Sequence, residues 1–364
     1  AMADFLASRA VNPGRSGFDI SLEAGDMIDG VRARLGRLFR NPADDPDRTI
    51  FTANATAALN LALNGILGEG DHVIASVVEH NSVLRPLTML AKAGRITFDL
   101  APCDGRGVVD PDDVAHLVTP RTRLVALTHA GNVFGSVQPV AEVGRLCRER
   151  NLVYLVDAAQ TAGFLPVDMT AMGADLVAFT GHKSLLGPTG IGGLVVGPGV
   201  DPAPTLWGGT GVRSAQLEHP SDYPWRLEAG TLNTVGITGL GAALDWLETR
   251  GREEVAGHES ALTDRFLAGC ASLAGVTVHG PGPSAEGLRV PVVSFTIEGQ
   301  DPEKTGLFLD ADWDIAVRTG LQCAPLAHEA LGTAPAGTVR ASFGPFNTAA
   351  HVDRLLEALT ALSH

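Results

Sequence analysis

The chain has 364 residues, of which 45% are hydrophobic and 19% charged, as in folded globular proteins. Its net charge of −14 argues against nucleic acid or an anionic membrane surface as a partner. No apolar run approaches the roughly 18 residues of a membrane helix, and the first residues do not predict a secretory signal. Four cysteines are too few for a disulfide framework and form no metal-ligand pair. We therefore expect a cytoplasmic α/β protein without a bound metal.

Short β-rich runs alternate with segments of helical period through the middle of the chain. This alternation is typical of a mostly parallel sheet covered by helices on both faces. Helices are predicted at 84–93 and 140–150. Strands are predicted at 72–78, 96–100, 123–128, 152–156, 176–179 and 193–196.

The pattern changes after a glycine-spaced helical stretch at 231–247. The following order of elements predicts a smaller α+β domain: a helix from about 262, strands at 276–279 and 292–297, a helix, a strand at 315–318 and a last helix from 349. We expect three parts: an N-terminal segment 1–24 that joins the small domain, a large domain over 25–245 and a small domain over 246–364.

Polar side chains follow four of the predicted strands where each strand ends. His80 follows the first of them, and Asn132 follows the strand at 123–128. The remaining two are followed by Asp157 and Gln160, and by Thr180, His182 and Lys183. Ligands bind at the carboxyl ends of the strands in an open parallel sheet, so we expect one edge to collect these groups. A helix cap or a solvated loop would explain each residue alone, but not the set.

Three segments suit particular chemistry. Small residues at 51–56 precede a helical run, where backbone amides and the helix dipole could hold a phosphate, although an ordinary Thr N-cap is the commoner case. Asp157 could hold a protonated ring nitrogen, although it could equally cap a helix. Lys183, in a Gly-rich setting, suits Schiff-base formation because desolvation favours its neutral amine.

The order of these motifs resembles the fold-type I, class V pyridoxal-phosphate enzymes, and within them the cysteine desulfurases of the sulfur-carrier-type branch. The similar segments run over nearly the whole chain and include WRLEAGT at 225–231, RTGLQCAP at 318–325 and RASF at 340–343. The resemblance implies an α/β large domain with a mostly parallel sheet flanked by helices, and a smaller C-terminal α+β domain.

Carried onto this chain, the resemblance implies pyridoxal 5′-phosphate as cofactor and three catalytic residues. Lys183 would hold the cofactor as a Schiff base, and His80 would stack on its ring and transfer protons. Cys323 would lie on a loop over the pocket as the nucleophile. Asp157 would pair with the ring nitrogen, which makes the ring a better electron sink.

The resemblance also implies residues that bind without reacting. Thr231 would reach the phosphate of the neighbouring subunit, so a homodimer is expected. Arg340 would clamp the substrate carboxylate, a task that suits the guanidinium fork, with Asn132 and Arg15 beside it. The ring oxygen and the phosphate would be contacted by Asn132, Gln160, Ala55, Thr56, Thr180 and His182.

The chain departs from the family's pattern in two places that bear on the substrate. It begins Ala1-Met2-Ala3, without the short strand and Asn-Ala-Ala segment that open the family's chains, which fits a shortened or excised piece. Phe18 stands where a His is common.

The leading hypothesis is removal of sulfur from L-cysteine, giving alanine and a persulfide on Cys323 that a protein acceptor could take. A free Cys is otherwise most often a small buried hydrophobe. The alternative is a C–S β-lyase, excised from a larger biosynthetic protein, that acts on cysteine or an S-substituted cysteine. It would give pyruvate, ammonia and a thiol or persulfide, with Cys323 dispensable. A transaminase ranks third, and a non-enzymatic module last.

Overall fold

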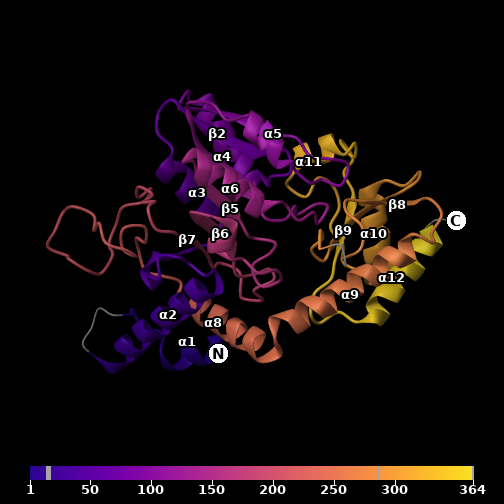
Figure 1. The fold of residues 1–364 in the computed structure, drawn as a ribbon. Coiled ribbons are helices and arrows are strands. Elements are labelled where there is room, and N and C mark those ends of the chain that lie inside the picture. Colours follow the sequence, from indigo (N-terminus) through magenta and orange to yellow (C-terminus); the bar gives the residue numbers. More distant parts are fainter. Residues whose placement is uncertain (14–17, 285–286, 363–364) are drawn as a thin grey trace.

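A computed structural model of the chain describes residues 1–13, 18–284 and 287–362 (Figure 1). Its central sheet has seven strands in the order β1-β7-β6-β5-β4-β2-β3. Strands β2 to β6 run parallel to one another, whereas β7 runs antiparallel to both β6 and β1. The expected mostly parallel α/β sheet is therefore confirmed. The strands are β1 (Thr49–Thr52), β2 (Asp71–Ser76), β3 (Ile96–Ala101), β4 (Thr122–Thr128), β5 (Val153–Asp157), β6 (Leu176–Thr180) and β7 (Gly192–Val196).

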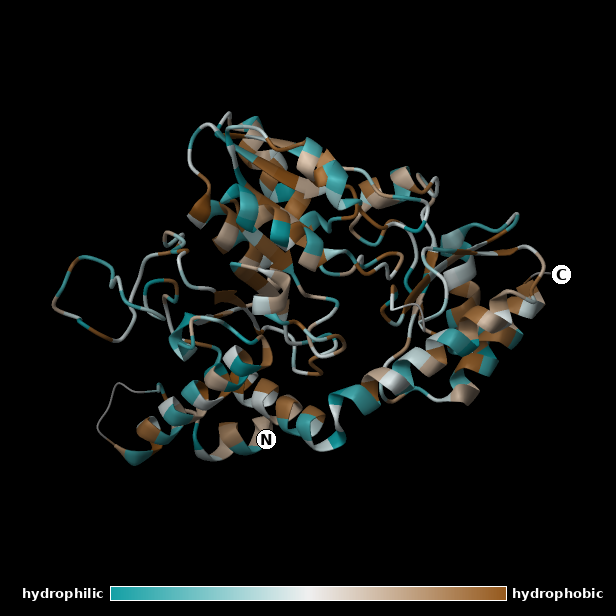
Figure 2. Ribbon diagram, viewed as in Figure 1, coloured by the Kyte–Doolittle hydropathy of each residue, from teal (hydrophilic) through white to brown (hydrophobic). Residues whose placement is uncertain are grey.

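Helices cover both faces of this sheet, and the strand side chains alternate between two cores. On β4, Leu124 and Ala126 pack with α3 and α4, whereas Val125 and Leu127 pack with α2, α6 and α8. The inner strands are hydrophobic on both sides, as expected for buried parallel strands (Figure 2). The helices are α1 (Met2–Ser8), α2 (Asp19–Leu38), α3 (Ala55–Ile66), α4 (Asn81–Lys92), α5 (Pro111–His116), α6 (Val140–Arg150), α7 (Met169–Met172) and α8 (Thr234–Arg250).

A smaller lobe contains an antiparallel sheet in the order β10-β9-β8 (Figure 1). Helices α9 and α12 pack together on it, around Phe266, Phe295 and Leu355. None of the helices that the structure describes is both long and apolar enough to cross a membrane. The elements are α9 (Arg252–Cys270), β8 (Val276–His279), β9 (Val292–Ile297), α10 (Pro302–Trp313), α11 (Pro325–Ala330), β10 (Val339–Ser342) and α12 (Ala349–Leu362).

The expected strand at 315–318 is wrong. Arg318 alone pairs with the sheet, in an isolated bridge with Arg340, and the chain then turns at Gly320, whose φ is +82°. Ile315 and Val317 are apolar because they pack against the core of the small lobe. Burial, rather than strand pairing, therefore explains the β-rich composition of this run.

Two segments lie elsewhere than the expected domain division implies. Met2 in α1 lies against Gly239 of α8, so the N-terminal helix packs under the large domain (Figure 1). Ala324 and Ala327 of the α11 region belong to the core of the central sheet. We propose that α1 and α11 be counted with the large domain, and that Gly251, between α8 and α9, marks the junction.

Candidate active site

The carboxyl ends of β2, β4, β5 and β6 meet the start of α3 around a cavity of about 270 Å³. The parallel register explains this convergence, because Thr128 at the end of β4 pairs with Asp157 at the end of β5. Every cofactor residue expected from the sequence except Thr231 lines this cavity. The lining residues include Ala55, Thr56, His80, Asn132, Asp157, Gln160, Thr180, His182 and Lys183.

The start of α3 forms one wall of the cavity. Asn54 is the N-cap, and its side chain accepts a hydrogen bond from the Ala57 amide at 3.0 Å. The amides of Ala55 and Thr56 precede the first intrahelical bonds and remain available to an anion. The Thr56 hydroxyl lies 2.7 Å from that of Ser82, which adds hydroxyl groups to the same wall.

His80 is held in one neutral tautomer. The Ser82 backbone amide, which can only donate, gives its hydrogen bond to His80 Nδ1 at 3.0 Å. The proton of the neutral ring is therefore on Nε2. Burial and the nearby positive charge of Lys183 lower the pKa of His80 to about 4, so the ring is neutral at pH 7.

Asp157 is buried and Lys183 is half-buried, and both line the cavity. Burial lowers the pKa of Lys183, with Arg340 and Arg318 contributing positive charge, while Asp157 opposes the shift. Burial also raises the pKa of Asp157, whose Oδ1 accepts a hydrogen bond from the Ala159 amide at 2.9 Å. Both pKa shifts disfavour the charged forms. The Lys183 amine is therefore less basic than usual, and a cationic partner would favour ionisation of Asp157.

Cys323 lies at the edge of this site. It lines an adjoining cavity of about 530 Å³ together with His80 and Thr56. Arg318 Nη2 lies 3.7 Å from Cys323 Sγ, within hydrogen-bonding reach of sulfur, and the Asn81 amide donates to the Cys323 carbonyl at 2.8 Å. The sulfur therefore faces a guanidinium group and shares a cavity with the His80 ring.

Arg340 approaches from the small lobe. Its Nη1 donates to the Asn132 carbonyl at 2.7 Å, and its buried Nε has no partner among the described residues. Burial and the charge of Arg318 lower the pKa of Arg340 to about 10. A buried guanidinium with an unused donor is suited to an incoming carboxylate.

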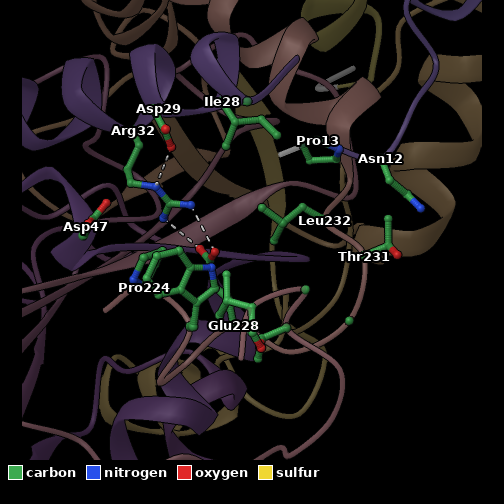
Figure 3. Close-up of a pocket in the computed structure, with 16 residues that line it drawn as sticks. Asn12, Pro13, Ile28, Asp29, Arg32, Asp47, Pro224, Glu228, Thr231 and Leu232 are labelled. Atoms are coloured by element: carbon green, nitrogen blue, oxygen red, sulfur yellow. Dashed lines mark hydrogen bonds and ion pairs between the residues drawn. The ribbon is translucent and has the colours of Figure 1, made fainter. Parts of the chain in front are cut away.

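Three expected site residues that the structure describes do not line this cavity: Cys323, Arg340 and Thr231. Thr231 lines a separate cavity of about 260 Å³, where Arg32 and Glu228 face each other (Figure 3). Arg15 lies outside the residues that the structure describes.

Sequence reasoning missed Glu79 and Ser82. Ser82 contacts both His80 and Thr56, and its place just inside the helix start after His80 could have indicated it. Glu79 is fully buried: its Oε1 accepts from the Ser76 hydroxyl at 2.6 Å and from the Thr128 amide at 3.0 Å, and its Oε2 has no partner among the described residues. Burial raises the pKa of Glu79 to about 8. The available signal in the sequence was an acidic residue, Glu79, directly after an apolar β-rich run.

These donors fit pyridoxal phosphate. The cofactor needs an amine for a Schiff base, an acid for its ring nitrogen and an anion site for its phosphate. Lys183, Asp157 and the start of α3 supply these groups around one cavity.

Comparison with known proteins agrees with this chemistry. The family model described as Aminotransferase class-V matches residues 1–355. A probable cysteine desulfurase of Methanothermobacter thermautotrophicus is 34% identical, covering 100% of this chain and 90% of the relative. A probable cysteine desulfurase of Aeropyrum pernix is 36% identical, covering 99% and 89%.

Solved structures agree as well. The apo structure of a cysteine desulfurase from Thermococcus onnurineus NA1 matches with a TM-score of 0.90 at 30% identity, covering 100% of this chain and 90% of that one. The S-sulfonic acid form of the cysteine desulfurase CsdA from Escherichia coli matches with a TM-score of 0.86 at 29% identity, covering 99% and 89%.

Proposed function

The chain belongs to the class-V aminotransferase family of pyridoxal-phosphate enzymes, and from this we propose that it is a cysteine desulfurase, which converts L-cysteine to alanine and leaves a persulfide on Cys323. One observation carries the proposal. Cys323 Sγ lies beside Arg318 at a cavity that also contains His80, next to the residues that fit the cofactor.

Lys183, Asp157 and the start of α3 would hold the cofactor. Once bound, it supplies an electron sink that makes the α-carbon of the amino acid acidic. The lowered pKa of Lys183 keeps a fraction of its amine neutral, as a Schiff-base nucleophile and a proton carrier must be. The Asp157 carboxylate would stabilise a protonated ring nitrogen. Ala55 and Thr56 amides, with the Thr180 and His182 side chains, would hold the phosphate.

His80 and Arg340 would orient the reacting groups. His80 holds its proton at Nε2 because Nδ1 is occupied by the Ser82 amide, and its neutral ring can stack on an aromatic cofactor. Arg340 would bind the substrate carboxylate with its unpartnered Nε. Asn132 would support this contact, because its carbonyl holds Arg340 in place.

The sulfur would pass from the substrate to Cys323, with the bound cofactor supplying the electron sink. The Cys323 thiolate attacks the substrate sulfur, so that a sulfur–sulfur bond forms and the carbon–sulfur bond breaks. The β-carbon keeps the electron pair and takes up a proton, which gives alanine and an enzyme persulfide without an external oxidant. Arg318 Nη2 lies 3.7 Å from Cys323 Sγ, and this contact would orient the attacking sulfur.

A homodimer and a protein sulfur acceptor complete the proposal. The segment between β7 and α8 extends from the body and exposes Leu206, Trp207 and Leu217 (Figure 1). A second copy would cover these apolar side chains and could bring Thr231 toward a neighbouring phosphate site. Light scattering during gel filtration should give twice the chain mass, and a monomer would contradict this part. Mass spectrometry of an acceptor thiol would detect sulfur transfer from Cys323.

The deciding experiment supplies L-cysteine to the cofactor-loaded protein and identifies the carbon product. Alanine from the wild type, lost in Cys323→Ala, supports the desulfurase. Pyruvate from both proteins would establish C–S lysis instead, and Cys323 would then be dispensable.

A further inference from the structure

His328 in α11 lies beneath the turn that carries Cys323, and it is completely buried. Its Nε2 lies 2.9 Å from Gln322 Oε1 and its Nδ1 lies 2.7 Å from the Thr333 hydroxyl. Gln322 Nε2 donates to the Thr338 carbonyl at 2.8 Å, so Gln322 Oε1 is the accepting atom of the amide. His328 Nε2 therefore carries the proton, and His328 donates it to Gln322.

The turn itself has an unfavourable backbone conformation. Gln322 and Cys323 follow one another with φ values of +42° and +64°, and such left-handed conformations cost free energy in residues other than glycine. They persist only where the surroundings impose them. The buried Gln322 side chain is bonded at both amide atoms, which supplies such a restraint.

The same turn is connected to the substrate side of the cavity. The Gln322 carbonyl accepts a hydrogen bond from Asn132 Nδ2 at 2.7 Å, and the Asn132 carbonyl accepts one from Arg340 at 2.7 Å. A shift of Gln322 would therefore move the cysteine turn and loosen the contact that orients Asn132. His328 does not contact the sulfur, whose polar neighbour is Arg318.

We propose that His328 is a positioning residue that acts through Gln322 to keep the Cys323 sulfur beside Arg318 at the cofactor cavity. This inference rests on the proposed role of Cys323 as the persulfide carrier. Loss of the His328 donor would leave buried Gln322 Oε1 with only the long 3.4 Å hydrogen bond from the Thr338 hydroxyl, and this loss of hydrogen bonding favours rearrangement of the turn. The His328 imidazole thus positions the Cys323 sulfur and does not act as a base toward it.

The test compares His328→Leu, which removes the donor, with His328→Gln, whose side-chain amide can donate from nearly the position of Nε2. His72→Leu is the matched control, because His72 is a buried, hydrogen-bonded histidine at the opposite end of β2. Three readouts are taken on the cofactor-loaded proteins. With L-cysteine, we measure the cofactor absorbance change and, by peptide mass spectrometry, the rate at which the Cys323 persulfide forms. With iodoacetamide, we measure the rate of Cys323 alkylation by the same method.

We expect His328→Leu to slow persulfide formation at least tenfold and alkylation at least threefold, with the absorbance change within twofold of wild type. His328→Gln should recover both rates to within threefold, and His72→Leu should behave as wild type. If His328→Leu does not fold, Gln322→Met removes the same hydrogen bond from the other side and is measured in its place.

Equal losses in all three readouts would overturn the proposal, because they would indicate a general folding role. Wild-type persulfide and alkylation rates in His328→Leu would overturn it too, as would failure of His328→Gln to recover them. The alkylation rate needs no desulfurase activity. If the wild type forms no alanine, the proposed function is refuted. The Cys323 alkylation rates of the His328 variants would still test the role of His328.

Discussion

The large domain contains two acid–base pairs, Arg32 with Glu228 and Lys183 with Asp157, and their hydrogen bonding differs. Arg32 donates to both oxygens of Glu228 at 2.9 and 3.0 Å, and Glu228 also accepts from the Phe51 amide at 2.6 Å. Lys183 and Asp157 form no ion pair in the described part of the chain, and both line a cavity. Arg32 and Glu228 also border a cavity, so the difference lies in their hydrogen bonds. Removal of either partner would leave the other charge buried and uncompensated, whereas groups with shifted pKa values and no ion pair indicate a binding site.

Removing the amine of the second pair should have the largest effect on chemistry. Lys183→Ala should abolish the yellow Schiff-base absorbance and lower alanine formation by roughly 10³-fold or more. The melting temperature of the cofactor-free protein should change little, because Lys183 has no buried partner to lose. Exposed Lys304→Ala is the control, and retention of the absorbance by Lys183→Ala would remove this lysine from the cofactor site.

Breaking the first pair should affect stability instead. Glu228→Gln leaves Arg32 buried without its carboxylate, which should cost about 3–5 kcal/mol of unfolding free energy. Denaturant unfolding of the cofactor-free protein measures this loss. Glu254→Gln, which removes an exposed partner of Arg250, should leave the midpoint nearly unchanged. Equal midpoints for the two variants would contradict the structural role of the Arg32–Glu228 pair.

Buried Glu79, which forms no ion pair among the described residues, offers a pH-dependent test. Its folded pKa of about 8 exceeds the ordinary value of 4.5, so between these values the unfolded chain loses a proton that the folded chain keeps. Wild-type stability should therefore fall by up to about 1.4 kcal/mol per pH unit from this group as the pH rises from 4.5 to 8.

Glu79→Gln lacks this titration, so its stability relative to wild type should increase across the same window by on the order of 5 kcal/mol and level off above pH 8. Urea unfolding at half-unit pH intervals measures the difference. A difference that does not change with pH would mean that Glu79 has an ordinary pKa in the folded protein.

The smallest expected effect concerns the substrate. Arg340→Lys keeps the positive charge but loses the guanidinium fork, so KM for L-cysteine should rise about 10- to 100-fold while kcat changes less. Steady-state alanine formation measures both constants. An unchanged KM would show that Arg340 does not bind the carboxylate.

Local pattern was sufficient for much of the fold. The strands at 276–279 and 292–297 have the predicted bounds, because apolar β-branched runs between turns leave few alternatives. The run at 315–318 has similar composition but forms no strand, because only Arg318 pairs with the sheet while Ile315 and Val317 pack against the small-lobe core. The β1 strand was not predicted, since its four residues pair only with β7, far along the chain.

The sequence by itself determined the chemistry that the protein can offer: a lysine, an acid and a histidine at strand ends, in an order that parallel strands bring to one edge. Tertiary structure alone decided which groups meet across long separations, because hydrogen bonds such as that between Asn132 and Gln322 depend on packing rather than on local propensity. The burial of Glu79, the placing of Thr231 in a second cavity and the support of the Cys323 turn by His328 are all of this kind.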